Sequence, residues 1–140
     1  MEAALFESKT AFILGAGASA ELKFPTGIAL MQHIKRKLSL DRNQTFLSDQ
    51  EIHSALLTHV NQTRPDSPSQ YSLSDYLEAA EQISLAMPLS VSIDTYMDDH
   101  RTDPRIELCG RLAIVKSILE AEHNSKHEFS LTCHRGSFLG

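Results

Sequence analysis

The sequence predicts an α/β fold that is rich in helices, with one clear N-terminal strand followed by about five helices. The strand is predicted from a short apolar run at residues 11–14, which stops abruptly at a glycine turn. The helices are predicted from later segments that repeat apolar residues every three or four positions. With 140 residues, 41% of them hydrophobic, the chain is long enough for one domain with an ordinary core.

The glycine turn that follows the strand carries a nucleotide-binding pattern. Gly15-x-Gly17-x-x-Ala20 fits the alanine-ended form of the dinucleotide fingerprint, in which helix N-terminal N–H groups hold a pyrophosphate. This fingerprint expects an acidic residue about 20 positions later, at the end of a second strand. Asp41 lies near that spacing, but residues 38–40 do not have the pattern of a strand. A tight turn that holds no ligand is therefore an alternative on the residues alone.

Two amphipathic helices are expected after this turn. The first covers residues 26–38, with Thr26 as its N-cap and a basic C-terminal end that suits the helix dipole. The second begins at Ser48, whose side chain is expected to form a capping box with Glu51, and runs to about Val60.

Three more helices are expected in the second half of the chain. One starts at Ser74 and is closed by Pro88, and a short acidic one is capped by Ser92. The longest covers residues 104–122, and the sequence loses its periodicity afterwards. We therefore divide the chain into a domain at residues 1–125 and an irregular tail at residues 126–140.

The longest helix is apolar around much of its circumference. One stripe consists of Leu108, Leu112, Val115 and Leu119. Because further apolar residues flank this stripe, we expect the helix to be buried on two sides. Gly110 weakens the helix by about 1 kcal/mol relative to alanine, and a neighbouring backbone packed closely against it would compensate.

Composition excludes several classes of protein. The net charge of −5 gives no electrostatic footprint for nucleic acid, and no apolar run is long enough to span a membrane. The two cysteines suggest no disulfide framework, which points to the cytoplasm. Histidines and a cysteine near the C-terminus have no familiar zinc-ligand spacing, so no metal is expected.

Two motifs, in order, resemble the bacterial SIR2-like proteins of the sirtuin superfamily. The first is ILGAGAS at residues 13–19, followed by FPTG at 24–27. The second is SIDTYMD at residues 92–98, followed by GRLAI at 110–114. Classical deacylase sirtuins carry G-I-P-x-F-R after the glycine loop, and its absence here points to the NAD-cleaving or regulatory branch. The resemblance covers roughly residues 10–125.

The resemblance implies a Rossmann-like, SIR2-type fragment that binds NAD or ADP-ribose. The residues implied to contact the phosphates or ribose, or to shape the pocket wall, are Gly15, Ala16, Gly17, Ser19, Pro25 and Thr26. The reaction class of the full-length proteins is cleavage of the nicotinamide–ribose bond. Their catalytic asparagine and histidine lie in N-Y-D and H-G strings, and neither string occurs here. We therefore expect a truncated module that is inactive alone and has no catalytic residue.

Two alternatives to the SIR2-like hypothesis remain. One is a generic Rossmann-type oxidoreductase fragment, which a second strand ending in an acidic residue would favour. The other is a non-catalytic helical module for interaction or oligomerisation, which a mass above one protomer without nucleotide affinity would favour. A lone buried strand would leave its backbone groups unpaired, so we also expect a homo-oligomer or a partner that completes the sheet.

Overall fold

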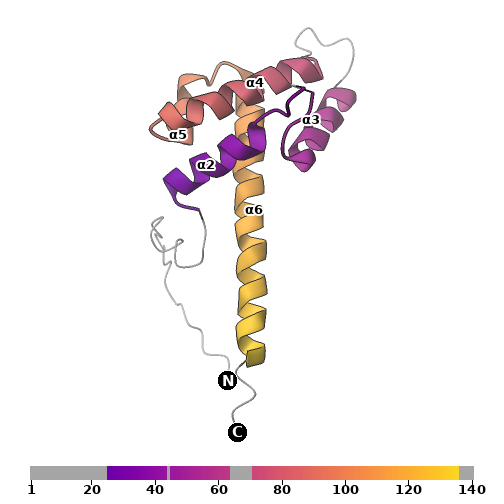
Figure 1. The fold of residues 1–140 in the computed structure, drawn as a ribbon. Coiled ribbons are helices and arrows are strands. Elements are labelled where there is room, and N and C mark those ends of the chain that lie inside the picture. Colours follow the sequence, from indigo (N-terminus) through magenta and orange to yellow (C-terminus); the bar gives the residue numbers. More distant parts are fainter. Residues whose placement is uncertain (1–24, 44, 64–70, 136–140) are drawn as a thin grey trace, which may run out of the picture.

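The structure is a computed structural model that describes residues 25–43, 45–63 and 71–135, with side chains described as far as residue 125. These residues form five α-helices and one short 3-10 helix (Figure 1). In chain order, the elements are α2 (Gly27–Leu38), α3 (Gln50–Gln62), α4 (Leu73–Ala86), η1 (Met87–Leu89), α5 (Ile93–Asp99) and α6 (Pro104–Arg135).

The predicted α/β, Rossmann-like fold is wrong, because the described residues form an all-helical fold without a strand or a sheet. Their only extended pairing is an isolated antiparallel bridge between Leu40 and Leu47. The helices bury their apolar faces against one another, so this core closes without a sheet. The strand expected within residues 10–14 lies outside the described residues, and the sheet-completing partner that depended on it stays a prediction.

The helices begin close to the predicted positions, but two of the caps differ. Thr26 stands at the N-cap of α2 without a side-chain cap bond. Asp49 replaces Ser48 as the cap of α3, and its carboxylate accepts from the N–H groups of Glu51 and Ile52.

Ser72 caps α4 in a capping box, two residues before the predicted start. Ser92 caps α5 as predicted, and its hydroxyl accepts from the backbone N–H of Thr95 at 3.1 Å.

The long helix α6 is the axis of the molecule. Helices α2, α3, α4 and α5 all pack against it, and its C-terminal part projects beyond the other described helices (Figure 1). The largest fully buried side chains come from α2, α3, α4, η1 and α6, and include Ile34, Leu38, Leu56, Ile83, Met87 and Ile106. None of the described helices has both the length and the apolar composition of a membrane-spanning segment.

Helix α6 is longer than predicted. It continues to Arg135, so residues 126–135, which we expected to be irregular, are helical. The sequence has no proline or glycine between Gly110 and Gly136 that would end the helix earlier. At Gly110 the close neighbour is the Met97 side chain of α5 and not a backbone, since a Cβ built there would lie 2.8 Å from the Met97 sulfur.

Candidate functional site

The predicted nucleotide-contacting residues lie mostly outside the described part of the chain. Gly15, Ala16, Gly17 and Ser19 all precede it. Pro25 is half-buried and Thr26 is exposed, and both stand directly before α2. The Thr26 carbonyl accepts the N–H of Leu30 at 2.7 Å, which starts the helix. The structure therefore brings these two residues to the N-terminus of α2, and it does not describe the other four.

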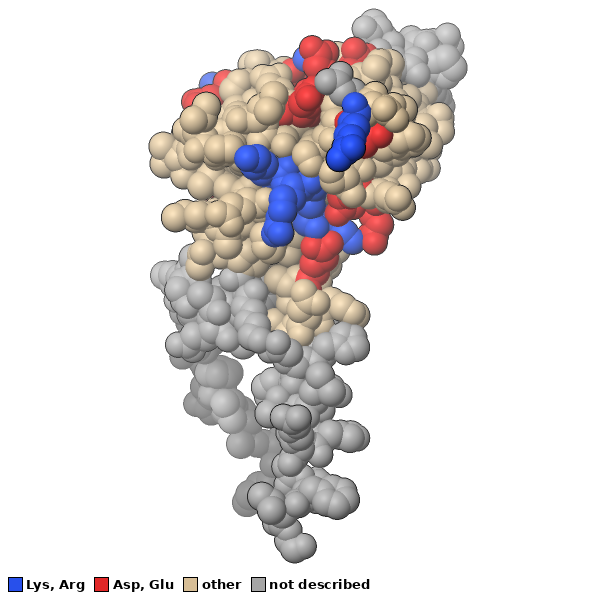
Figure 2. All heavy atoms as spheres, viewed as in Figure 1, with Lys and Arg blue, Asp and Glu red and all other residues tan. Residues whose placement is uncertain are grey.

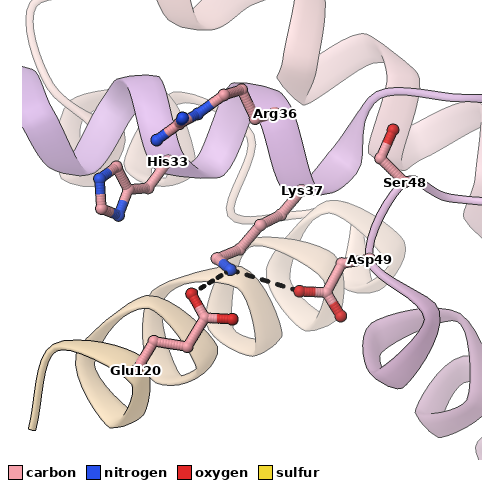
Figure 3. Close-up of a pocket in the computed structure, with 6 residues that line it drawn as sticks. All are labelled: His33, Arg36, Lys37, Ser48, Asp49 and Glu120. Carbon is pink, nitrogen blue, oxygen red and sulfur yellow. Dashed lines mark hydrogen bonds and ion pairs between the residues drawn. The ribbon is translucent and has the colours of Figure 1, made fainter. Parts of the chain in front are cut away.

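A polar pocket of about 370 Å³ lies where α2, the start of α3 and α6 meet (Figure 3). Its lining side chains are His33, Arg36, Lys37, Ser48, Asp49 and Glu120. At its centre, the Lys37 ammonium lies 3.3 Å from an Asp49 carboxylate oxygen and 2.5 Å from one of Glu120 (Figure 3). Only 12% of the Lys37 side chain is exposed, so this ammonium depends on its two partners.

Lys116 extends this cluster along α6. Its ammonium lies 2.6 Å from Glu51 and 3.5 Å from Glu120, so Glu120 is shared between two lysines. We call Lys37, Asp49, Glu51, Lys116 and Glu120 the ion-pair junction, since they join α2, α3 and α6. In Figure 2, cationic side chains gather on this face of the bundle with acidic ones directly beside them.

The pocket is balanced in charge. Arg36 and Lys37 are opposed by Asp49 and Glu120. Burial, together with the nearby Arg36 and Lys37, lowers the pKa of His33 and so favours its neutral form. Two carboxylates on the wall oppose the binding of a phosphate. The arrangement therefore suits an ion-pair junction that fixes the helices better than it suits a nucleotide site.

The Cys109 thiol is free and fully buried on α6. Burial raises its pKa to about 12. Because the thiolate is the nucleophilic form, Cys109 is a core residue and not a nucleophile. Within the described residues, no three histidine, cysteine or acidic side chains come together in a way that could hold a metal ion.

An apolar groove of about 440 Å³ runs between α2 and η1. Ile28 and Met31 of α2 line it with Met87 and Pro88 of η1. Leu89, close by in η1, is 90% exposed.

We call the predicted apolar stripe of α6 the α6 stripe: Leu108, Leu112, Val115 and Leu119. Leu108 and Leu112 are half-buried and pack against the core, whereas Val115 and Leu119 face outward. The structure buries a different face of the helix, formed mainly by small residues: Ile106, Cys109, Gly110, Ala113, Ser117 and Ala121. Val115 is 53% exposed and Leu119 is 55% exposed, with Ile118 beside them. The prediction that α6 is buried on two sides is therefore wrong for the C-terminal half of the stripe.

Sequence reasoning missed the ion-pair junction. Lys37 and Glu120 lie 83 positions apart, and no local pattern links them. The α6 stripe, in contrast, was visible in the sequence, and only its exposure is new.

Comparisons with protein-family models, with curated protein sequences and with solved structures found no match. The resemblance to SIR2-like domains and the binding of NAD therefore stay predictions.

Proposed function

We propose that this chain is a non-catalytic helical interaction module that associates with a second copy of itself through the α6 stripe. The observation that carries the proposal is the exposure of Val115 and Leu119 side by side on α6, with Ile118 next to them. Large apolar side chains left in water forgo about 25 cal/mol for each Å² that a partner could bury. Burying these side chains against a partner would therefore contribute favourable free energy to association.

The spacing of the stripe indicates what kind of partner fits. Its four residues are separated by four, three and four positions, which is the spacing of the seam between two helices in a coiled coil. A second copy presents the same exposed half of the stripe, Val115 and Leu119, so each copy has a matching surface on the other.

We place the module in the cytoplasm as part of the same proposal. The Cys109 thiol is free and buried, which suits a reducing compartment.

The proposal is tested by measuring the mass of the full chain in solution by size-exclusion chromatography with light scattering. The wild-type chain is expected to shift from monomer towards dimer as its concentration rises. The combined variant Val115→Glu and Leu119→Glu places carboxylates in the seam and is expected to stay monomeric. Leu57→Glu, at an exposed apolar position on α3, is the matched control and is expected to associate like the wild type.

Two results would contradict the proposal. One is a wild-type chain that is monomeric at every concentration. The other is a stripe variant that associates as strongly as the Leu57→Glu control, because the contact would then lie elsewhere on the molecule.

A second candidate function is the binding of NAD or ADP-ribose, which we propose on the resemblance of residues 13–27. One observation favours it. The N-terminus of α2, directly after this segment, has no side-chain cap and no acidic residue in its first turn. Such a terminus leaves backbone N–H groups open to an anion.

The nucleotide proposal is tested by calorimetric titration of the full chain with NAD and with ADP-ribose. Heat of binding that is lost in Gly17→Leu and kept in Gly27→Ala would support it, because a Cβ at Gly27 meets no described atom within 4 Å. No heat from a folded wild-type sample would contradict it.

A further inference from the structure

We infer that the apolar groove between α2 and η1 is the docking site of the chain's own apolar segment at residues 11–14, which lies outside the described residues. The inference concerns another surface than the α6 stripe and does not depend on the proposed self-association. It combines the lining of the groove, the composition of the segment and the length of chain that joins the two.

The groove suits an apolar occupant. Among its lining residues, Met87 is buried, whereas Ile28 on α2 is largely exposed. Leu89 and Val91, the chain neighbours of the lining residue Ser90, are largely exposed as well. Each Å² of this apolar surface that an occupant covers contributes about 25 cal/mol to its docking.

The segment at residues 11–14, Ala-Phe-Ile-Leu, has the matching composition. It contains no polar side chain and three large apolar ones. The sequence predicts that such a run is buried, but the described residues offer it no sheet to join. The groove is an apolar surface on which it can be buried instead.

The connection between the segment and the groove is short. Ten residues, 15–24, lead from the segment to Pro25 at the start of α2, and they reach up to about 35 Å when extended. The α2 wall of the groove, from Ile28 to Lys35, is only about 10 Å long. The segment therefore reaches every part of the groove.

This short connection favours the chain's own segment over an occupant from another molecule. Two parts of one chain joined in this way meet at an effective concentration of about millimolar. A second copy at micromolar concentration competes poorly with it.

The chain has a second apolar run before α2, at residues 3–6, Ala-Ala-Leu-Phe. This run has two large apolar side chains instead of three. Its connection to α2 is longer, which lowers its effective concentration by about a factor of two. Residues 3–6 are therefore the weaker occupant and provide the matched control.

The reactivity of a cysteine in the groove tests the docking in the full chain. Ile28→Cys is made together with Cys133→Ser, and its alkylation by N-ethylmaleimide is followed by mass spectrometry; Cys109 is buried and stays unreactive. Adding Phe12→Asp and Ile13→Asp should release the segment. Alkylation is then expected to become about fivefold faster, as for a groove that is covered about 80% of the time.

Two controls show whether the effect is specific. Leu5→Asp and Phe6→Asp add the same two charges to the other run and should leave the rate at Ile28→Cys unchanged. Leu57→Cys, on α3 outside the groove, should react at the same rate with and without the changes at Phe12 and Ile13. Circular dichroism checks that each variant keeps its helices.

A second probe keeps the apolar lining intact. Ser90→Cys replaces a side chain of nearly the same size and should show the same acceleration as Ile28→Cys. Rates that do not respond to Phe12→Asp and Ile13→Asp at either position would overturn the docking of residues 11–14. An equal response to the changes at Leu5 and Phe6 would overturn the choice of this segment.

The dependence on concentration separates this inference from self-association. Slow alkylation that is the same in dilute and concentrated samples is expected when the segment belongs to the same chain. Protection that appears only as the concentration rises would mean that a second copy covers the groove. That result would overturn docking within the chain and leave the proposed self-association standing.

Discussion

The two faces of α6 differ in the size of their side chains, and the difference runs against the usual expectation for a core. The face packed into the bundle carries mostly small residues such as Gly110, Ala113 and Ser117. The outer face carries the larger Val115 and Leu119, which remain more than half exposed. Small residues let neighbouring helices approach α6 closely, so the packed face gains its stability from contact with large side chains of α2 and α4.

This contrast shows that an apolar stripe does not by itself identify the buried face of a helix. On α6 the C-terminal half of the stripe, Val115 and Leu119, is exposed, whereas the face of small residues packs in the core. Substitutions on the two faces should therefore separate stability from association.

The largest effect is expected from a carboxylate placed on the inner face. Ala113→Glu puts an unpaired charge at a position that is fully buried, and is expected to lower the free energy of unfolding by about 3 kcal/mol or more. Val115→Glu, two residues away on the outer face, should change it by about 0.5 kcal/mol or less. Urea denaturation followed by circular dichroism, at a concentration where the chain is monomeric, measures both. Equal losses would contradict the assignment of the faces.

A smaller loss is expected at Gly110. Gly110→Leu forces the Met97 side chain away and should displace α5, at a cost of about 2 kcal/mol. Met97→Ala in the same chain makes room and should recover part of that loss. The free energies of the two single variants and the double variant form a cycle, and simple additivity would show that the two residues do not compete for space.

A further, smaller effect is expected at the border between the faces, where Glu120 joins the ion-pair junction. Glu120→Gln leaves Lys37 with Asp49 alone, and we expect a loss of about 1 kcal/mol in the free energy of unfolding. Glu107→Gln removes an exposed pair with Arg111 and is the control, with a loss near zero. A loss for Glu120→Gln no larger than that of the control would mean that the junction adds nothing to stability.

The smallest effect concerns the pH dependence at His33. Its pKa is lowered in the folded chain by burial and by Arg36 and Lys37, so the unfolded chain takes up this proton first as the pH falls. The contribution of His33 to stability is therefore intact above its unfolded pKa of about 6.5 and declines below it. His33→Asn should reduce the loss of stability between about pH 7.5 and pH 5.5. An unchanged or steeper loss would contradict the direction of the shift.

The sequence predicts the helices well, because they follow from local spacing. Ser92 caps α5 as expected, and Pro104 begins α6. Ser48 does not cap α3, since its hydroxyl instead donates to the Ser39 carbonyl at 3.0 Å, and the adjacent Asp49 takes the cap. When two neighbouring residues can both cap a helix, the sequence does not show which one does, because the choice depends on their tertiary contacts.

The predictions fail where they depend on long-range contacts. The α/β fold was predicted from the glycine turn and apolar run at residues 11–17, which lie outside the described residues, whereas the helical core is set by contacts among α2, α3, α4 and α6. The pairing of Lys37 with Glu120 likewise joins distant parts of the chain. The exposure of the α6 stripe was missed because spacing shows which residues share a face and not which neighbours cover that face.

Sedimentation velocity of the unaltered full chain, from low micromolar concentration to the highest that stays in solution, tests the central claim most directly. If the α6 stripe binds a second copy, the sedimentation coefficient will rise with concentration towards that of a dimer, and the Val115→Glu and Leu119→Glu variant will not follow. A coefficient that stays at the monomer value throughout would contradict the claim, and the outer face of α6 would then not be an interface between copies.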